Sequence, residues 1–157
     1  MPSRASYGKA APEVFQGMLA LSAVVQKSGL AAGLVDLVYL RVSQINGCAY
    51  CLDMHSKDLR ARGETEQRIY MLPAWREVPD LYNARERAAL AWAEAVTRLT
   101  DQEVSDEVYD QAQKEFDDKE LAQLTLAVGA INAWNRLNVA FRTPAGNYKS
   151  AVKQSAA

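Results

Sequence analysis

The sequence predicts an all-α protein with a single compact domain of about six to eight helices. Apolar residues recur at helical spacing through most of the 157 residues, and Gly and Pro fall mainly between those stretches. Because 49% of the residues are hydrophobic, a chain of this length can bury its own core without disulfides or a structural metal. There is no room for a second full domain, so we place the helical domain at residues 12–142.

Two terminal segments flank this domain. Residues 1–11 are expected to be a flexible N-terminus, and they lack the continuous apolar core of a signal peptide. Residues 143–157 are small and polar, so we expect a frayed tail. No window reaches the length of about 20 apolar residues that spans a bilayer. These features predict a cytoplasmic protein, whose two cysteines stay reduced unless they take part in redox or metal chemistry.

The charge distribution excludes two classes of partner. The chain has 18 Lys and Arg against 19 Asp and Glu, a net charge of -1, and it has no basic stretch. Nucleic acids and anionic membranes both attract clustered positive charge. We therefore expect neither of them to be a partner of this protein.

Turn signals divide the first half of the domain into three helices. Residues 12–27 begin with Pro and end at Ser28 and Gly29, which is typical of a helix with Pro in its first turn. Residues 30–45 are rich in Leu and Val, and their length favours a largely buried helix over a strand. A third helix is expected over residues 48–62, directly after Asn46 and Gly47, and Gly63 ends it.

Capping patterns mark the helices of the second half. A short helix is expected over residues 65–72, and a capping box that begins at Asn83 opens residues 84–99. Another helix begins after Ser105, and a cap at 117–120 precedes the last long segment. That segment is apolar over more than one stripe, so it is either the central helix or part of a subunit interface. We accordingly expect a homo-oligomer.

Cys48, Cys51 and His55 form the one constellation with evident chemistry. They stand at i, i+3 and i+7, so a helix places all three within about 60° of one another. The Cα atoms of residues i and i+3 of a helix are about 5 Å apart, which allows a disulfide. The positive end of the helix dipole favours thiolate near Cys48, and His55 lies one turn after Cys51, where it can accept a proton.

Other interpretations of these residues exist. Two cysteines at this spacing also occur without any role, and a lone histidine on a helix is more often a surface residue than a catalyst. A zinc site would need a fourth ligand, and the chain has no second Cys/His pair to supply it. The residue types therefore favour redox chemistry without a metal or an organic cofactor.

Two stretches resemble a known family. Residues 40–65, LRVSQINGCAYCLDMHSKDLRARGET, and residues 131–142, INAWNRLNVAFR, are similar to the AhpD-like alkylhydroperoxidase branch of the carboxymuconolactone decarboxylase superfamily. The resemblance implies an all-helical, oligomeric protein that reduces hydroperoxides through its two cysteines. It also implies an external dithiol reductant, either a lipoylated protein or a thiol reductase. The decarboxylases of the superfamily lack the cysteine pair, which argues against lactone decarboxylation here.

The resemblance also implies residue roles. Cys51 corresponds to the thiol that attacks the peroxide, and Cys48 to the partner that closes the disulfide. His55 corresponds to the histidine of a proton relay, whose carboxylate is a glutamate in the best known members and Asp36 here. Tyr50 stands where those members carry a further histidine.

The leading hypothesis is a thiol-dependent peroxidase with Cys51, Cys48, His55 and Asp36 as its site. The alternative is a redox-responsive regulator or disulfide reductase that uses the same cysteines without peroxide turnover. For the polar and aromatic residues of the last helix we expect packing and hydrogen bonds between helices rather than catalysis. They are Asn132, Trp134, Asn135 and Arg136.

Overall fold

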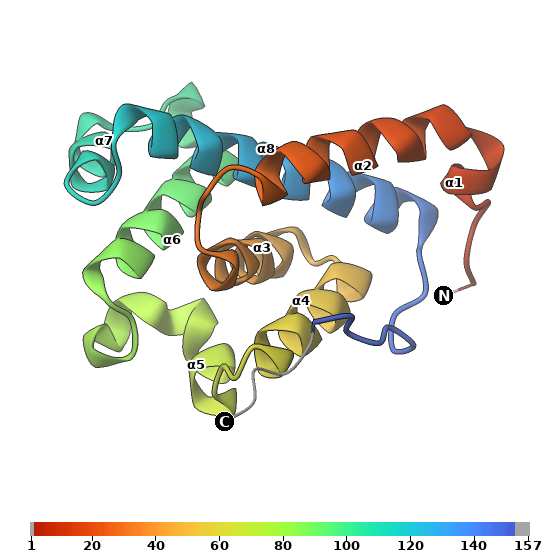
Figure 1. The fold of residues 1–157 in the computed structure, drawn as a ribbon, viewed down its shortest axis with the longest axis horizontal. Helices are drawn as coiled ribbons and strands as arrows, with labels where there is room; N and C mark the ends of the chain where they lie inside the picture. Colours follow the sequence, from red (N-terminus) through yellow and green to blue (C-terminus); the bar gives the residue numbers. More distant parts are fainter. Residues whose placement is uncertain (1, 153–157) are drawn as a thin grey trace.

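Residues 2–152, the part of the chain that this computed structural model describes, form eight α-helices and no β-strand (Figure 1). The all-α prediction is confirmed, and the helix ends lie close to those expected. The helices are α1 (Tyr7–Ala10), α2 (Pro12–Gln26), α3 (Ala32–Asn46), α4 (Ala49–Ala61), α5 (Glu66–Met71), α6 (Ala84–Arg98), α7 (Asp106–Gln113) and α8 (Asp118–Phe141). Within the same residues, none of the helices combines the length and the apolar character that crossing a membrane requires.

The core lies around α3 and α8, which pack against each other near the middle of the molecule (Figure 1). One side of α8 buries Leu124, Val128 and Ile131 with residues of α3 and α6. Another side presents Ala127 and Ala130, whose small side chains let α2 approach closely. The many apolar stripes of α8 therefore identify it as a central helix, the first of its two predicted roles. Burying each of its Leu or Ile side chains contributes about 1.5–3 kcal/mol.

A tight turn joins α3 to α4 and sets the position of both cysteines. Gly47 ends α3 with a φ of 65°, a left-handed conformation that glycine adopts without a steric penalty. Cys48 is the N-cap of α4, and its Sγ accepts a hydrogen bond from the backbone N–H of Cys51 at 3.3 Å. Cys51 therefore lies in the first turn of α4, at the positive end of the helix dipole.

The N-terminal segment, expected to be flexible over residues 1–11, contains a short helix and contacts with α8. Residues Tyr7–Ala10 form α1, and the backbone N–H of Arg4 donates to the carbonyl of Phe141 at 3.1 Å. The Arg4 guanidinium also donates to the carbonyl of Ala140 at 2.8 Å. Carbonyl groups at the end of a helix lack partners within that helix, so the last turn of α8 supplies acceptors that hold this segment.

The C-terminal tail, expected to be frayed, makes contacts with α4 over the residues described. It runs from the end of α8 back across α4 (Figure 1). The backbone N–H of Gly146 donates to Asp53 at 2.9 Å, and Lys57 donates to the carbonyl of Tyr148 at 2.9 Å. Polar side chains of α4 thus provide the tail with specific partners. Residues 153–157 of the expected tail lie outside the described residues.

A buried carboxylate, that of Glu94, ties α6 to α3 and to the Leu72–Glu77 turn that follows α5. Glu94 is 2% exposed, and its carboxylate accepts hydrogen bonds from Arg41 at 2.7 Å and from Trp75 at 3.0 Å. Arg76 donates to it as well. Burial alone would raise the pKa of Glu94, but these hydrogen bonds outweigh it and hold the pKa below its ordinary value.

We expect Glu94→Ala to lower the free energy of unfolding by about 3 kcal/mol, because it leaves the buried Arg41 without its partner. The exposed pair Arg60–Glu66 offers a control, since solvent screens this pair and Glu66→Ala should cost far less than Glu94→Ala. The contribution of Glu94 to the free energy of unfolding should be fully present above about pH 4.3, which is the pKa of Glu in the unfolded chain. It should be lost as the pH falls through the lower pKa that Glu94 has in the folded protein. Urea unfolding at several pH values measures both effects, and equal losses for the two variants would contradict this account.

Candidate active site

The site is a cavity of about 550 Å³ between α2, α3, α4, α8 and the C-terminal tail. Most of its reactive and polar lining comes from α3, α4 and α8, with Tyr7 of α1 and Tyr148 of the tail, while α2 contributes mainly apolar side chains. The chemically informative lining residues are Asp36, Tyr39, Tyr50, Cys51, His55 and Asn138. Three of the four residues that the sequence singled out therefore meet at one cavity, and the fourth, Cys48, is bonded to Cys51.

Cys48 and Cys51 form a disulfide with a Cα–Cα distance of 5.3 Å, as the i, i+3 spacing allows. Both residues are almost fully buried, but they differ in what they face. Cys51 lines the cavity, whereas Cys48 does not. A small molecule in the cavity would thus reach the sulfur of Cys51 first.

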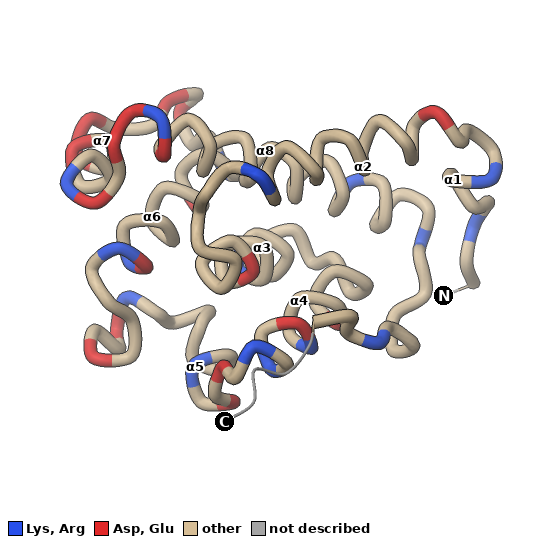
Figure 2. The backbone as a smooth tube through the Cα atoms, in the orientation of Figure 1, with Lys and Arg blue, Asp and Glu red and all other residues tan. Residues whose placement is uncertain are grey.

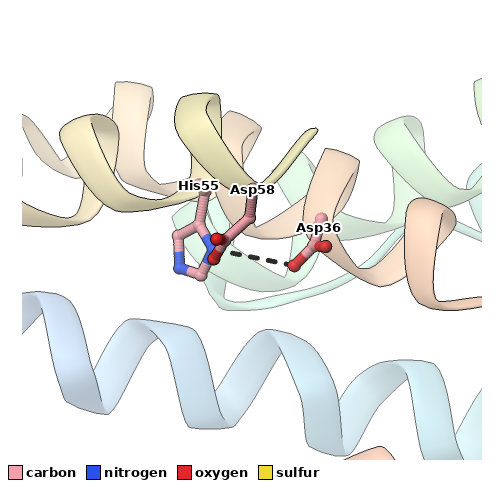
Figure 3. A group of neighbouring side chains, drawn as sticks. All are labelled: Asp36, His55 and Asp58. Atoms are coloured by element: carbon pink, nitrogen blue, oxygen red, sulfur yellow. Dashed lines mark ion pairs between the residues drawn. The ribbon is translucent and has the colours of Figure 1, made fainter. Parts of the chain in front are cut away.

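His55 lies close to Asp36 across the α3–α4 interface (Figure 3). Its Nδ1 is 3.8 Å from Oδ1 of Asp36, which is beyond the usual hydrogen-bond distance. The residue is 4% exposed, and within residues 2–152 neither ring nitrogen has a hydrogen-bond partner. Aspartate is one methylene shorter than glutamate, so its carboxylate stops short of a direct hydrogen bond to the ring, and a small side-chain movement would close the gap.

Asp36 faces the cavity and forms a second, shorter contact. Its Oδ2 accepts a hydrogen bond from Nε of Arg62 at 2.6 Å, and its side chain is 13% exposed. The sequence left open whether Asp36 is buried or on an exposed turn, and the structure places it at the cavity. Arg62, from the end of α4, keeps a positive charge beside it.

Asp58 is a site residue that sequence reasoning missed. It lies three residues after His55 on α4 and is 8% exposed. Its carboxylate accepts hydrogen bonds from the hydroxyl groups of Tyr148, at 3.0 and 3.1 Å, and of Ser150, at 2.5 Å. The i, i+3 spacing to His55 was the available signal, but nothing in the sequence indicated that the tail returns to α4.

Two tyrosines of the cavity stay protonated at neutral pH. Burial, with a contribution from Asp36, raises the pKa of Tyr39 to about 12, and the Tyr39 ring packs edge-on against His55 at 5.0 Å. Burial and the Asp58 carboxylate together raise the pKa of Tyr148 to about 12. Both phenols are therefore hydrogen-bond donors rather than bases at this site.

Asp36, His55 and Asp58 each offer one ligand atom within 4.8 Å of the others, a separation that a divalent cation could bridge (Figure 3). The present partners of the two carboxylates argue against that use. Asp36 forms an ion pair with the Arg62 guanidinium, and Asp58 accepts hydrogen bonds from two hydroxyl groups. A cation would have to displace these groups and would lie beside a fixed positive charge. The arrangement suits proton transfer better than metal binding.

Three of the four α8 residues expected to join helices do so, whereas Arg136 donates to Asn132 within α8 itself. Asn46 donates to both Asn132 and Asn135 at 2.9 Å, and Asn135 donates to Ser43 at 3.1 Å. Trp134 donates to Ser22 of α2 at 2.9 Å. The Asn46 contacts also anchor the end of α3, directly before the turn that carries Cys48.

Asn138 is the second residue that sequence reasoning missed. It lies on α8, is 4% exposed, and its side-chain Nδ2 is 3.6 Å from Sγ of Cys51. The motif INAWNRLN placed it on the same helix as the packing residues, but no spacing rule linked it to the cysteines. Only the packing of α8 against the first turn of α4 reveals this contact.

Comparison with known proteins places this geometry in a family. Residues 12–95 match the model of the carboxymuconolactone decarboxylase family. An uncharacterized Bacillus subtilis protein, YdfG, is 41% identical over 140 residues, which cover 89% of this chain and 95% of that protein.

Solved structures agree with the family match. The chain is similar to an Agrobacterium tumefaciens protein of unknown function with a suggested role as the antioxidant defence protein AhpD. That match has a TM-score of 0.89 and 42% identity, and it covers 94% of this chain and all of the other. A peroxidase-related protein with an AhpD core from Ralstonia eutropha has the same fold, with a TM-score of 0.78, 20% identity, and coverage of 89% and 74%. This chain belongs to the carboxymuconolactone decarboxylase family, as an AhpD-like member.

Proposed function

We propose that the protein is a thiol-dependent peroxidase that reduces hydroperoxides with the Cys48–Cys51 pair. One observation carries the proposal: a disulfide at the start of a helix has one sulfur, that of Cys51, at the wall of a cavity large enough for a small organic molecule. His55 and Asp36 line the same cavity, so proton-transfer groups accompany the redox sulfur. The family membership and the AhpD-like fold support the same function.

In the first step, the Cys51 thiolate attacks the terminal oxygen of the hydroperoxide. The O–O bond breaks, Cys51 becomes a sulfenic acid, and the departing alkoxide takes a proton and leaves as an alcohol. His55 supplies that proton directly or through a water, and Asp36 supports the positive charge on its ring. The first turn of α4 favours the thiolate that starts the reaction.

In the second step, the Cys48 thiol attacks the Cys51 sulfenic acid. The new S–S bond replaces the S–O bond, and water leaves. The 5.3 Å separation of the Cα atoms supports this closure without unfolding of the turn. An external dithiol in the reducing cytoplasm, such as a lipoylated protein or a thiol reductase, then returns two electrons and two protons to the pair.

Steady-state turnover tests this function. With excess dihydrolipoamide and tert-butyl hydroperoxide, we expect each chain to consume many equivalents of peroxide, because the reductant regenerates the dithiol. Cys51→Ser should abolish consumption, whereas Cys48→Ser should retain a single fast reaction with peroxide and lose turnover. Peroxide loss and alcohol formation are the measurements.

Three results would contradict the proposal. Consumption that stops after one equivalent per chain would favour the redox-responsive regulator. Reduction of a disulfide substrate by the reduced protein, with no peroxide consumption, would favour the disulfide reductase. A rate for Cys51→Ser equal to that of the parent would show that Cys51 is not the nucleophile.

The role of Asp36 gives a second expectation. Asp36→Asn removes the negative charge next to His55, so peroxide turnover should fall by at least about tenfold. Asp36→Glu should match or exceed the parent, because the longer side chain closes the 3.8 Å gap to Nδ1. Asp110→Asn, on the exposed surface of α7, is the matched control and should leave the rate unchanged. An unchanged rate for Asp36→Asn would remove Asp36 from the relay.

We further propose that the protein acts as a homo-oligomer. Lys, Arg, Asp and Glu are sparse along α2 and the middle of α8, which lie side by side (Figure 2). On α2 the large apolar residues Val14, Phe15, Leu19 and Val24 are between 39% and 57% exposed. Burial of such a face against a second copy would remove apolar area from water.

Light scattering at micromolar concentration should give a mass at least twice the 17.3 kDa of one chain. Replacing Leu19 and Val24 with Glu should shift the mass toward that of one chain, because the charges would be buried in the interface. A double charge change at two exposed positions of α7, Glu107→Lys and Asp110→Lys, is the control. A single-chain mass for the parent protein would refute the proposal.

A further inference from the structure

We infer that Asn138 is a catalytic residue whose side-chain amide holds and activates the Cys51 sulfur, and that Tyr7 orients this amide. The inference rests on the proposed function, in which the Cys51 thiolate is the attacking group. It adds a hydrogen-bond donor from α8 and a positioning residue from the N-terminal helix to that site.

The contact with sulfur is direct. Nδ2 of Asn138 donates to Sγ of Cys51 at 3.6 Å, and both residues are nearly fully buried. In the reduced protein, a sulfur that carries a negative charge gains more from such a donor than a neutral thiol does. The contact therefore favours the Cys51 thiolate over the neutral thiol, in addition to the effect of the helix N-terminus.

Tyr7 determines which end of the amide faces the sulfur. Its hydroxyl group donates to Oδ1 of Asn138 at 3.3 Å. Burial raises the pKa of Tyr7, with a smaller contribution from Tyr50, so the hydroxyl group keeps the proton that it donates. With Oδ1 occupied in this way, the two N–H bonds of the amide are directed away from Tyr7, and one of them points at Cys51.

The position of Tyr7 is itself built into the fold. The Tyr7 ring packs against Phe141 with 5.5 Å between the ring centroids, and the hydrogen bonds of Arg4 to Ala140 and Phe141 fix the segment before it. The N-terminal segment is thereby fastened to the last turn of α8, one turn beyond Asn138. This gives the short helix α1 a function at the site.

The experiment measures the pH dependence of Cys51 alkylation by iodoacetamide, followed by mass spectrometry, in a Cys48→Ser background. Asn138→Leu keeps a similar volume but removes the donor, so the pH midpoint should rise by about one unit and the rate at pH 7 should fall about tenfold. Asn138→Asp places a negative charge beside the thiolate and should raise the midpoint further. Tyr7→Phe should cause a smaller rise.

Two controls separate this effect from a loss of folding. Gln123→Leu removes an amide from another turn of α8, and Tyr109→Phe removes a hydroxyl group from α7, so both should leave the midpoint unchanged. Thermal unfolding of each variant shows which of them are folded under the assay conditions. Because alkylation uses no peroxide, a shifted midpoint without peroxide turnover would retain the effect of Asn138 on the Cys51 thiolate and overturn the proposed function.

Two results would overturn the inference, and a third would overturn only the role of Tyr7. One is an alkylation profile of folded Asn138→Leu that coincides with that of the parent. Another is an equal shift for Gln123→Leu, which would mean that the effect is general to α8. A shift for Asn138→Leu with none for Tyr7→Phe would remove Tyr7 from the arrangement and leave Asn138 alone.

Discussion

At Gly47 the chain turns from α3 into α4 with a φ of 65°, and the whole site depends on the direction that α4 takes from there. The turn makes Cys48 the N-cap and brings Cys51 into the first helical turn, where unpaired backbone N–H groups favour negative charge. One turn later, the same helix carries His55. A side chain at position 47 would strain the left-handed conformation and change the angle between α3 and α4.

Around this turn the protein combines an apolar cavity with a small number of directed polar groups. Apolar residues of α2 line the cavity and Cys51 is almost fully buried, and burial strengthens each electrostatic interaction at the sulfur. Arg62 pairs with Asp36, while hydroxyl groups of the tail hold Asp58. Each carboxylate near His55 therefore has a defined orientation, and proton transfer can occur without a large rearrangement of side chains.

The sequence predicts the helices well because their signals are local. Helical periodicity, the capping boxes at Asn83 and Asp117, and the glycine at position 47 act within a few residues. The i, i+3, i+7 spacing of Cys48, Cys51 and His55 is local for the same reason. It could therefore be recognised before any tertiary structure was known.

The remaining parts of the site depend on contacts between residues far apart in the chain. Asn138 reaches Cys51 across a separation of 87 residues, and Tyr7 reaches Asn138 across 131. Tyr148 reaches Asp58 across 90. The ends of the chain look flexible in sequence because they are short and polar, yet the carbonyls of α8 and the polar side chains of α4 give them partners. No local pattern encodes those partners.

A single-turnover reaction tests the central claim, that the cavity sulfur and its neighbour form a working dithiol, most directly. Fully reduced protein is mixed with one equivalent of tert-butyl hydroperoxide per chain, and its intact mass and the amount of tert-butanol are followed together. The account predicts the loss of two hydrogens from the protein, formation of an equal amount of alcohol, and restoration of the mass by dithiothreitol. An unchanged mass with intact peroxide would contradict it.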